Sequence, residues 1–134
     1  MENNCCLEDV LKVIDVLQKN ADCDDVDASC KRPFLGTLPN AVYFNTRPIT
    51  LYTPNATLIE TDYEVVIDGT TTTGTSSIYR VEDVKDCCVT CNVLAPNPDT
   101  TNELIPYIRT NTYITFNLNC IGAVRCLQDV IVNN

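Results

Sequence analysis

The sequence contains no histidine, the residue on which most acid–base catalysis and much metal binding depend. Without histidine the chain cannot build a Ser-His-Asp triad, a Cys/His dyad or a mixed Cys/His zinc site. Basic residues are also few, since nine Lys and Arg stand against 18 Asp and Glu, giving a formal net charge of −9. An acidic chain is unsuited to the phosphate backbone of nucleic acids or to an anionic membrane surface. We therefore expect neither nucleic acid nor membrane among its partners.

Two targeting features are missing as well. No apolar run approaches the length of a membrane-spanning helix. The first residues, Met1 to Cys6, carry no positive charge, and no apolar segment with a small-residue cleavage site follows them. We therefore expect synthesis in the cytoplasm without a signal peptide.

Cysteine, in contrast, is abundant, with nine residues in a chain of 134. This density is typical of small secreted domains held by disulfides, because the cytosol keeps thiols reduced. A chain of this length can bury a core of its own, so it does not need disulfides for stability in the way that very small domains do. Nine is an odd number, so at least one cysteine stays free or bonds to another chain. We expect cysteines that bond one another or other chains, with no catalytic role, cofactor or metal.

An amphipathic helix is predicted over residues 7–19. Acidic Glu8 and Asp9 in its first turn and Lys19 at its end suit the helix macrodipole. One apolar stripe follows the helical repeat, and its members are Leu7, Val10, Leu11, Ile14 and Leu17. Two cysteines precede the helix on a short polar arm and two follow it in an acidic loop, namely Cys5, Cys6, Cys23 and Cys30. We assign residues 1–32 to this arm, helix and loop, and residues 33–134 to a β-domain.

The β-domain is predicted from short runs rich in Thr, Val, Ile and Tyr that are broken by Pro, Asn and Gly. Strands are expected over residues 41–45, 49–53, 62–67, 78–82, 87–94, 104–109, 112–118 and 121–130. A hairpin turn is expected at residues 83–86, and loops at 69–77 and 96–102. Many short strands at even spacing predict a mainly β fold, a compact β-sandwich-like single domain with one N-terminal amphipathic helix.

The position of each cysteine suggests its role. Alternation along the predicted strand 87–94 places Cys87 and Cys91 on an apolar face, as buried thiols or in one internal bridge, and Cys88 on the opposite face. The intermolecular disulfide candidates are Cys5, Cys6, Cys23, Cys30 and Cys88. The intramolecular or buried thiol candidates are Cys87, Cys91, Cys120 and Cys126.

Three motifs point to other chemistry and are set aside. Residues 88–91 match the C-x-x-C spacing of zinc knuckles and thiol oxidoreductases, but no second such pair exists and the motif lies in a predicted strand. The acidic stretch 22–27 lacks the ligand positions of an EF-hand. Asn55 begins a glycosylation sequon, but we do not expect the chain to enter the secretory route in which such sites are glycosylated. No catalytic or metal-binding set remains, although a redox or metal-binding protein stays open as an alternative.

Four segments together resemble a known family. They begin with CKRPFLG at residue 30 and NTRPITLYT at residue 45, and continue with YRVEDVKDCCVTCNVL at residue 79 and FNLNCIGAVRCLQDV at residue 116. In this order they resemble the cysteine-rich spore outer-layer proteins of endospore-forming bacteria, the CotY/CotZ/ExsY family. The likeness runs over nearly the whole chain. It departs at Cys120-Ile121-Gly122, where members often have C-x-C, and at Tyr113, where they often have cysteine.

The resemblance implies a structural, non-enzymatic protein of the spore coat, crust or exosporium. Such proteins self-assemble into two-dimensional, typically hexagonal layers locked by disulfides, with copies of themselves and other cysteine-rich spore coat or exosporium proteins as partners. The resemblance also implies synthesis in the mother-cell cytoplasm and oxidation on the spore surface. A disulfide-linked filament is the alternative, because a head-to-tail contact gives rings or fibres according to its rotation.

Overall fold

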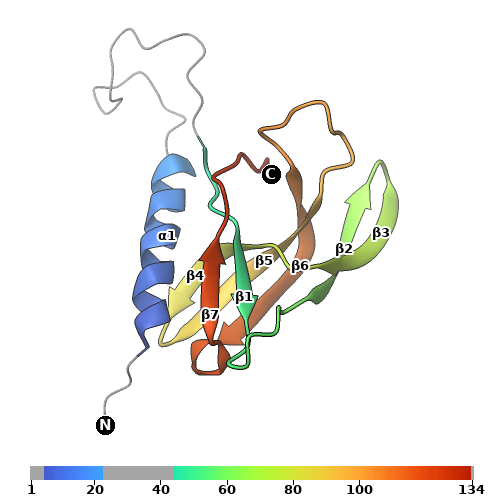
Figure 1. Ribbon diagram of the computed structural model, residues 1–134. Helices are drawn as coiled ribbons and strands as arrows, with labels where there is room; N and C mark the ends of the chain where they lie inside the picture. Colours follow the sequence, from blue (N-terminus) through green and yellow to red (C-terminus); the bar gives the residue numbers. More distant parts are fainter. Residues whose placement is uncertain (1–4, 23–43, 134) are drawn as a thin grey trace, which may run out of the picture.

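A computed structural model of the chain describes residues 5–22 and 44–133 (Figure 1). Its elements in chain order are α1 (Cys6–Asp22), β1 (Ile49–Tyr52), β2 (Thr61–Ile67), β3 (Thr70–Ser76), β4 (Tyr79–Lys85), β5 (Cys88–Pro96), β6 (Tyr107–Asn117), the short 3₁₀ helix η1 (Leu118–Cys120) and β7 (Ala123–Cys126). The predicted mainly β fold with one N-terminal helix is confirmed. The strand predicted at 41–45 lies outside the described residues over 41–43, and residues 44 and 45 are not in a strand.

The strands form two antiparallel sheets. The larger has the order β6-β5-β4-β1-β7, and β2 and β3 form a separate two-stranded sheet (Figure 1). The two sheets meet where β2 lies against β6, and the Glu64 N–H donates a hydrogen bond of 2.9 Å to Thr112 Oγ1 at this contact. The hairpin is therefore tied to the larger sheet by polar contacts as well as by burial of Val65.

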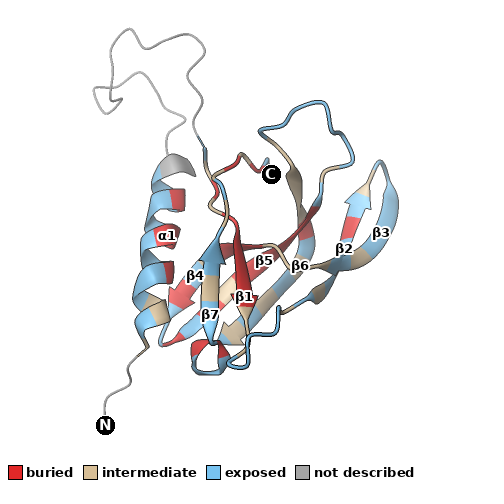
Figure 2. Ribbon diagram, viewed as in Figure 1, coloured by how far each residue is buried: buried red, intermediate tan, exposed pale blue. Residues whose placement is uncertain are grey.

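Helix α1 packs against β4 through one side only (Figure 2). Leu11 and Ile14 are 0% and 2% exposed, and the Gln18 amide donates to the Val81 carbonyl over 2.8 Å. The structure differs here from the predicted stripe, since Val10 and Leu17 remain about half exposed. These two side chains lie outside the face of α1 that contacts the sheet. That face is centred on the row that contains Leu11 and Gln18.

Strand β5 lies at the centre of the core. Its predicted alternation is confirmed at Val89, Cys91 and Val93, which are all fully buried. Asn92, on the opposite face of the strand, is buried as well. The register of β5 against β6 shifts directly after it, and its amide donates to the Thr110 carbonyl over 2.9 Å. The amide is satisfied in the interior by this backbone carbonyl, as buried polar groups must be.

Several elements differ from the sequence prediction, among them the strand expected at 121–130, which is limited to β7. The threonine-rich stretch expected as a loop forms strand β3, which pairs with β2 over its whole length. The two strands expected at 104–109 and 112–118 are one continuous strand, β6. The β4–β5 turn falls at Asp86 and Cys87, both with positive φ, because β4 continues to Lys85. A two-residue turn of this kind matches the twist of the strands that it connects.

Candidate cross-linking site

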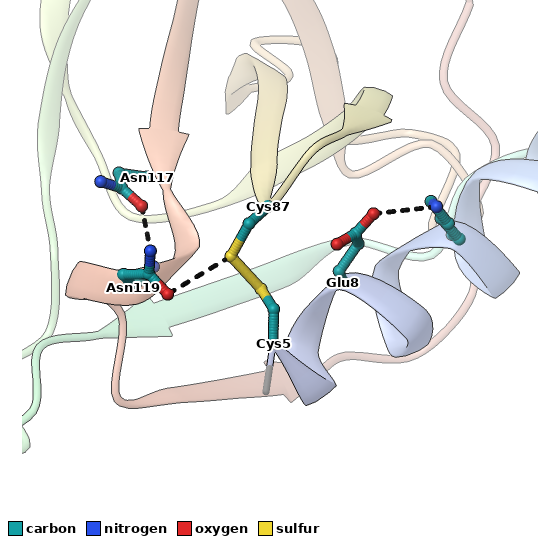
Figure 3. Close-up of a disulfide and its surroundings, with 6 residues drawn as sticks. Cys5, Glu8, Cys87, Asn117 and Asn119 are labelled. Carbon is teal, nitrogen blue, oxygen red and sulfur yellow. Dashed lines mark hydrogen bonds and ion pairs between the residues drawn. A yellow bond between two sulfur atoms is a disulfide. The ribbon is translucent and has the colours of Figure 1, made fainter. Parts of the chain in front are cut away.

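One disulfide joins the beginning of α1 to the β4–β5 turn. Cys5 and Cys87 are bonded with an S–S distance of 2.10 Å and a Cα–Cα distance of 6.1 Å (Figure 3). The Cys87 carbonyl accepts a 2.8 Å hydrogen bond from the Leu118 N–H, which fixes the turn against η1. The expectation that Cys5 reaches another chain is therefore corrected. Docking of α1 on β4 carries its first turn to the Cys87 thiol, which was assigned to an internal or buried role.

Two exposed thiols are direct neighbours of this bridge in the chain, and a third follows a residue that contacts it. Cys6 follows Cys5 as the first residue of α1, Cys88 follows Cys87 as the first residue of β5, and both are free and exposed. Cys120 follows Asn119, whose side-chain oxygen lies 3.5 Å from the Cys87 sulfur (Figure 3). One end of the molecule therefore presents Cys6, Cys88 and Cys120, which we call the thiol cluster.

A fourth exposed thiol stands apart from the thiol cluster. Cys126 is the last residue of β7, at the opposite end of that strand from η1, and it pairs with Ile49 of β1. Cys120 and Cys126 were both expected to be buried or bonded within the chain, and the structure corrects this, because both are free and exposed. Their segments, η1 and the edge strand β7, place few atoms over them. Cys23 and Cys30 lie outside the described residues.

Cys91 differs from the exposed thiols in its chemistry. It is fully buried in β5. Burial, with the nearby Glu82 carboxylate as a smaller cause, raises the pKa of the Cys91 thiol to about 12 from its ordinary value of 9.0. The thiolate is the reactive form of cysteine, so Cys91 is inert at neutral pH while the fold is intact.

We expect alkylation to distinguish these classes. With iodoacetamide at pH 8, mass spectrometry should show Cys6, Cys88, Cys120 and Cys126 modified and Cys91 untouched until the protein is unfolded. Because the unfolded chain releases the Cys91 proton near pH 9 and the folded chain holds it to about pH 12, stability should fall as pH rises through this window. Early alkylation of Cys91, or a melting temperature that rises over this window, would contradict the assignment.

Other features of the described surface offer no rival site. Within residues 5–22 and 44–133, no group of three or more Cys, Asp or Glu side chains is placed to hold a metal ion. A shallow hollow lies beside α1, and its charged residues, Arg47 and Asp129, pair with each other over 2.9 Å. The one helix in the described part of the chain is not long and apolar enough to cross a membrane. The exposed cysteines are therefore the reactive groups that the described surface presents.

Comparison with known proteins gives one result. The chain matches the family described as spore coat protein Z over residues 1–129. No match was found among curated proteins or among solved structures. The matched region includes α1, the complete larger sheet and every cysteine. The resemblance inferred from the four sequence segments is confirmed, and the chain belongs to the spore coat protein Z family.

Proposed function

We propose that this chain is a building block of a spore-surface layer in which copies associate and are then joined by disulfides through their exposed cysteines. Membership of a spore coat family gives the chain a structural role at the spore surface. The observation that carries the finer proposal is the presence of four free, exposed cysteines on a described fold that does not use them. The fold has its own core and its own internal bridge.

The placement of the exposed thiols supports an extended network. A chain that bonds at a single point can form only a dimer, whereas a chain that bonds at two separate points can continue a sheet or a fibre. The thiol cluster and Cys126 are two such points, at opposite ends of the segment from η1 through β7. Cys23 and Cys30 add further thiols to the same chain. Other cysteine-rich spore coat or exosporium proteins are suitable partners, because they can bond to any of these thiols.

Non-covalent association comes first in this proposal. A net charge of −9 makes copies repel at low ionic strength. Salt screens that repulsion, so that complementary surfaces of two copies can pack together. Oxidation then closes bonds between thiols that packing has already brought near, and the bonds remove the route to dissociation. Such a layer should form in reductant as a fragile assembly and resist denaturant only after oxidation.

The test is a variant in which Cys6, Cys88, Cys120 and Cys126 are all replaced by serine. We expect its melting temperature to stay within a few degrees of the wild type, because exposed substitutions change stability little. On oxidation with glutathione disulfide, the wild type should give denaturant-resistant multimers on a non-reducing gel, and the variant should lose most of them. The matched control is Cys91→Ala, which removes a buried thiol and should leave the multimers intact. Unchanged multimers in the four-serine variant would show that the cross-links lie elsewhere, at Cys23 and Cys30.

A further inference from the structure

Helix α1 carries a second apolar face that the rest of the described chain, residues 44–133, leaves uncovered. Four large aliphatic side chains on it are each about half exposed, namely Val10 at 47%, Val13 at 59%, Val16 at 55% and Leu17 at 50%. Leu11 and Ile14 belong to the core that α1 shares with the sheet, and the exposed part of α1 is turned away from that sheet (Figure 2). Single exposed apolar residues are ordinary, but a contiguous set marks an interaction surface. We call this set the outer stripe.

The spacing of the outer stripe is that of a helix–helix seam. Cys6, Val10, Val13 and Leu17 follow one another at intervals of four, three and four residues. This is the alternation of a and d positions along which two helices pack side by side. Cys6 is free and exposed at the N-terminal end of the same row. A reactive thiol is therefore in line with the apolar contact.

The charges of α1 argue against a lipid surface as the partner of the outer stripe. Lys12 pairs with Glu8 over 2.8 Å and Lys19 pairs with Asp15 over 3.0 Å. Asp9 and Asp22 are additional, so four acidic residues against two basic ones leave α1 with a formal charge of −2. Its charges are not basic, as they are on helices that lie on anionic lipid. A membrane is therefore a poor occupant of this face. A charge of this size is screened at physiological ionic strength, so it does not prevent two copies from meeting along the outer stripe.

We infer that the outer stripe is the contact for a second copy of this chain, with the two α1 helices parallel about a two-fold axis and Cys6 facing Cys6. This rests on the proposed self-assembly and names one of its contacts. In such a contact each residue of the seam meets its own counterpart. A second copy therefore brings matching valines to Val10 and Val13 and a thiol to Cys6 at the same height.

The size of the face supports this occupant. A helix of 17 residues is about 25 Å long, and one stripe along it is far smaller than the roughly 800 Å² per partner of a stable interface. The contact therefore cannot hold on its own and needs a covalent bond or repetition. A second copy supplies the bond through Cys6, and a layer supplies the repetition.

The covalent step balances with a small disulfide such as oxidised glutathione as oxidant. The Cys6 thiolate attacks one glutathione sulfur, forming a mixed disulfide and releasing one glutathione thiolate. The Cys6 thiolate of the second copy then attacks the Cys6 sulfur of the mixed disulfide and releases the other glutathione. Two protein thiols lose two protons and two electrons, and the oxidant takes them up as two thiols.

The test uses a full-length parent in which Cys6 is the only thiol left on the described surface and in residues 23–43. It carries Cys23→Ser, Cys30→Ser, Cys88→Ser, Cys120→Ser and Cys126→Ser, with the Cys5–Cys87 bridge intact. With oxidised glutathione this parent should give a dimer on a non-reducing gel, and mass spectrometry should identify a Cys6–Cys6 peptide. Val13→Glu added to the parent should slow dimer formation at least tenfold. The matched control is Val66→Glu, the same change at a valine of β2 that is 55% exposed, and it should leave the rate unchanged.

Circular dichroism should show that Val13→Glu folds, because the side chain is exposed. Equal rates for Val13→Glu and the parent would overturn the inference, as would a parent that stays monomeric because residues 23–43 or another protein cover the stripe. The proposed function is judged separately by electron microscopy of the otherwise wild-type chain. Layers that form normally with Val13→Glu would overturn this contact and leave the proposed function standing. The absence of any multimer in the wild type would overturn both.

Discussion

Replacing both Cys5 and Cys87 by serine should lower the free energy of unfolding by about 2–4 kcal/mol, because the bridge closes a loop that spans 82 residues. The melting temperature should fall by roughly 10 °C for a chain of this size. The loss acts mainly through the unfolded chain, which becomes free to explore more conformations. The sheet should nevertheless remain folded, with a β-rich circular dichroism spectrum and a cooperative melt, because its core does not depend on the bridge.

The matched control is Cys6→Ser with Cys88→Ser, the neighbouring pair on the same two segments. Both side chains are free and exposed, so this variant should unfold within about 0.5 kcal/mol of the wild type. Comparison of the two double variants in urea separates the bridge from its surroundings. Equal stabilities would show that the bridge contributes nothing, and a random-coil spectrum without it would show that the fold requires it.

Tyr79→Ala should be the most destabilising single change, at about 3–5 kcal/mol. The Tyr79 ring is fully buried and packs edge-on against Phe116 with a centroid distance of 5.4 Å. Its hydroxyl lies 2.7 Å from Thr61 Oγ1 and donates to the Ile59 carbonyl over 3.1 Å. The substitution leaves a cavity and removes the partner of two polar groups where the β2–β3 hairpin joins the core.

Tyr79→Phe separates these two effects. It keeps the ring and removes only the hydroxyl, so we expect a loss of about 1–3 kcal/mol from the unpaired buried groups. Urea unfolding of both variants should therefore give clearly different midpoints with similar slopes. If Tyr79→Ala and Tyr79→Phe lower the free energy of unfolding equally, the Tyr79 ring contributes no packing energy to the core.

Elements with a strong hydrophobic period could be predicted from sequence. The helix was predicted because its apolar residues recur every three to four positions, and β5 because apolar residues alternate along it. The inner row of the helix was harder to define, because α1 has apolar residues on two faces. Val10 and Leu17 belong to the outer stripe, and only the packed structure shows which face the sheet covers.

Strand β3 could not be recognised from hydrophobicity, because its threonines are mostly exposed. Its turn carried a usable signal instead. Asp68 and Gly69 both have positive φ, at 51° and 81°, and Asp-Gly between two runs of β-forming residues is a strong hairpin signature. That dipeptide predicts the β2–β3 hairpin better than the composition of either strand.

The candidate site was predictable only in part. The cysteines themselves identified the chemistry and the family, but neither their pairing nor their exposure follows from local pattern. Cys5 and Cys87 are 82 positions apart, and the docking of α1 is what brings them together. Cys120 and Cys126 are exposed because η1 and an edge strand carry them, and edge position is a property of the whole sheet.

The most direct measurement is low-dose electron microscopy of the purified wild-type protein at physiological ionic strength, before and after oxidation with glutathione disulfide. We expect ordered sheets in both samples, with only the oxidised sheets surviving denaturant and falling apart when reductant is added. Fibres in place of sheets would make the chain a filament subunit. A protein that stays monomeric and dispersed in both samples, with its exposed thiols oxidised only to glutathione adducts, would show that the chain does not assemble into a cross-linked layer.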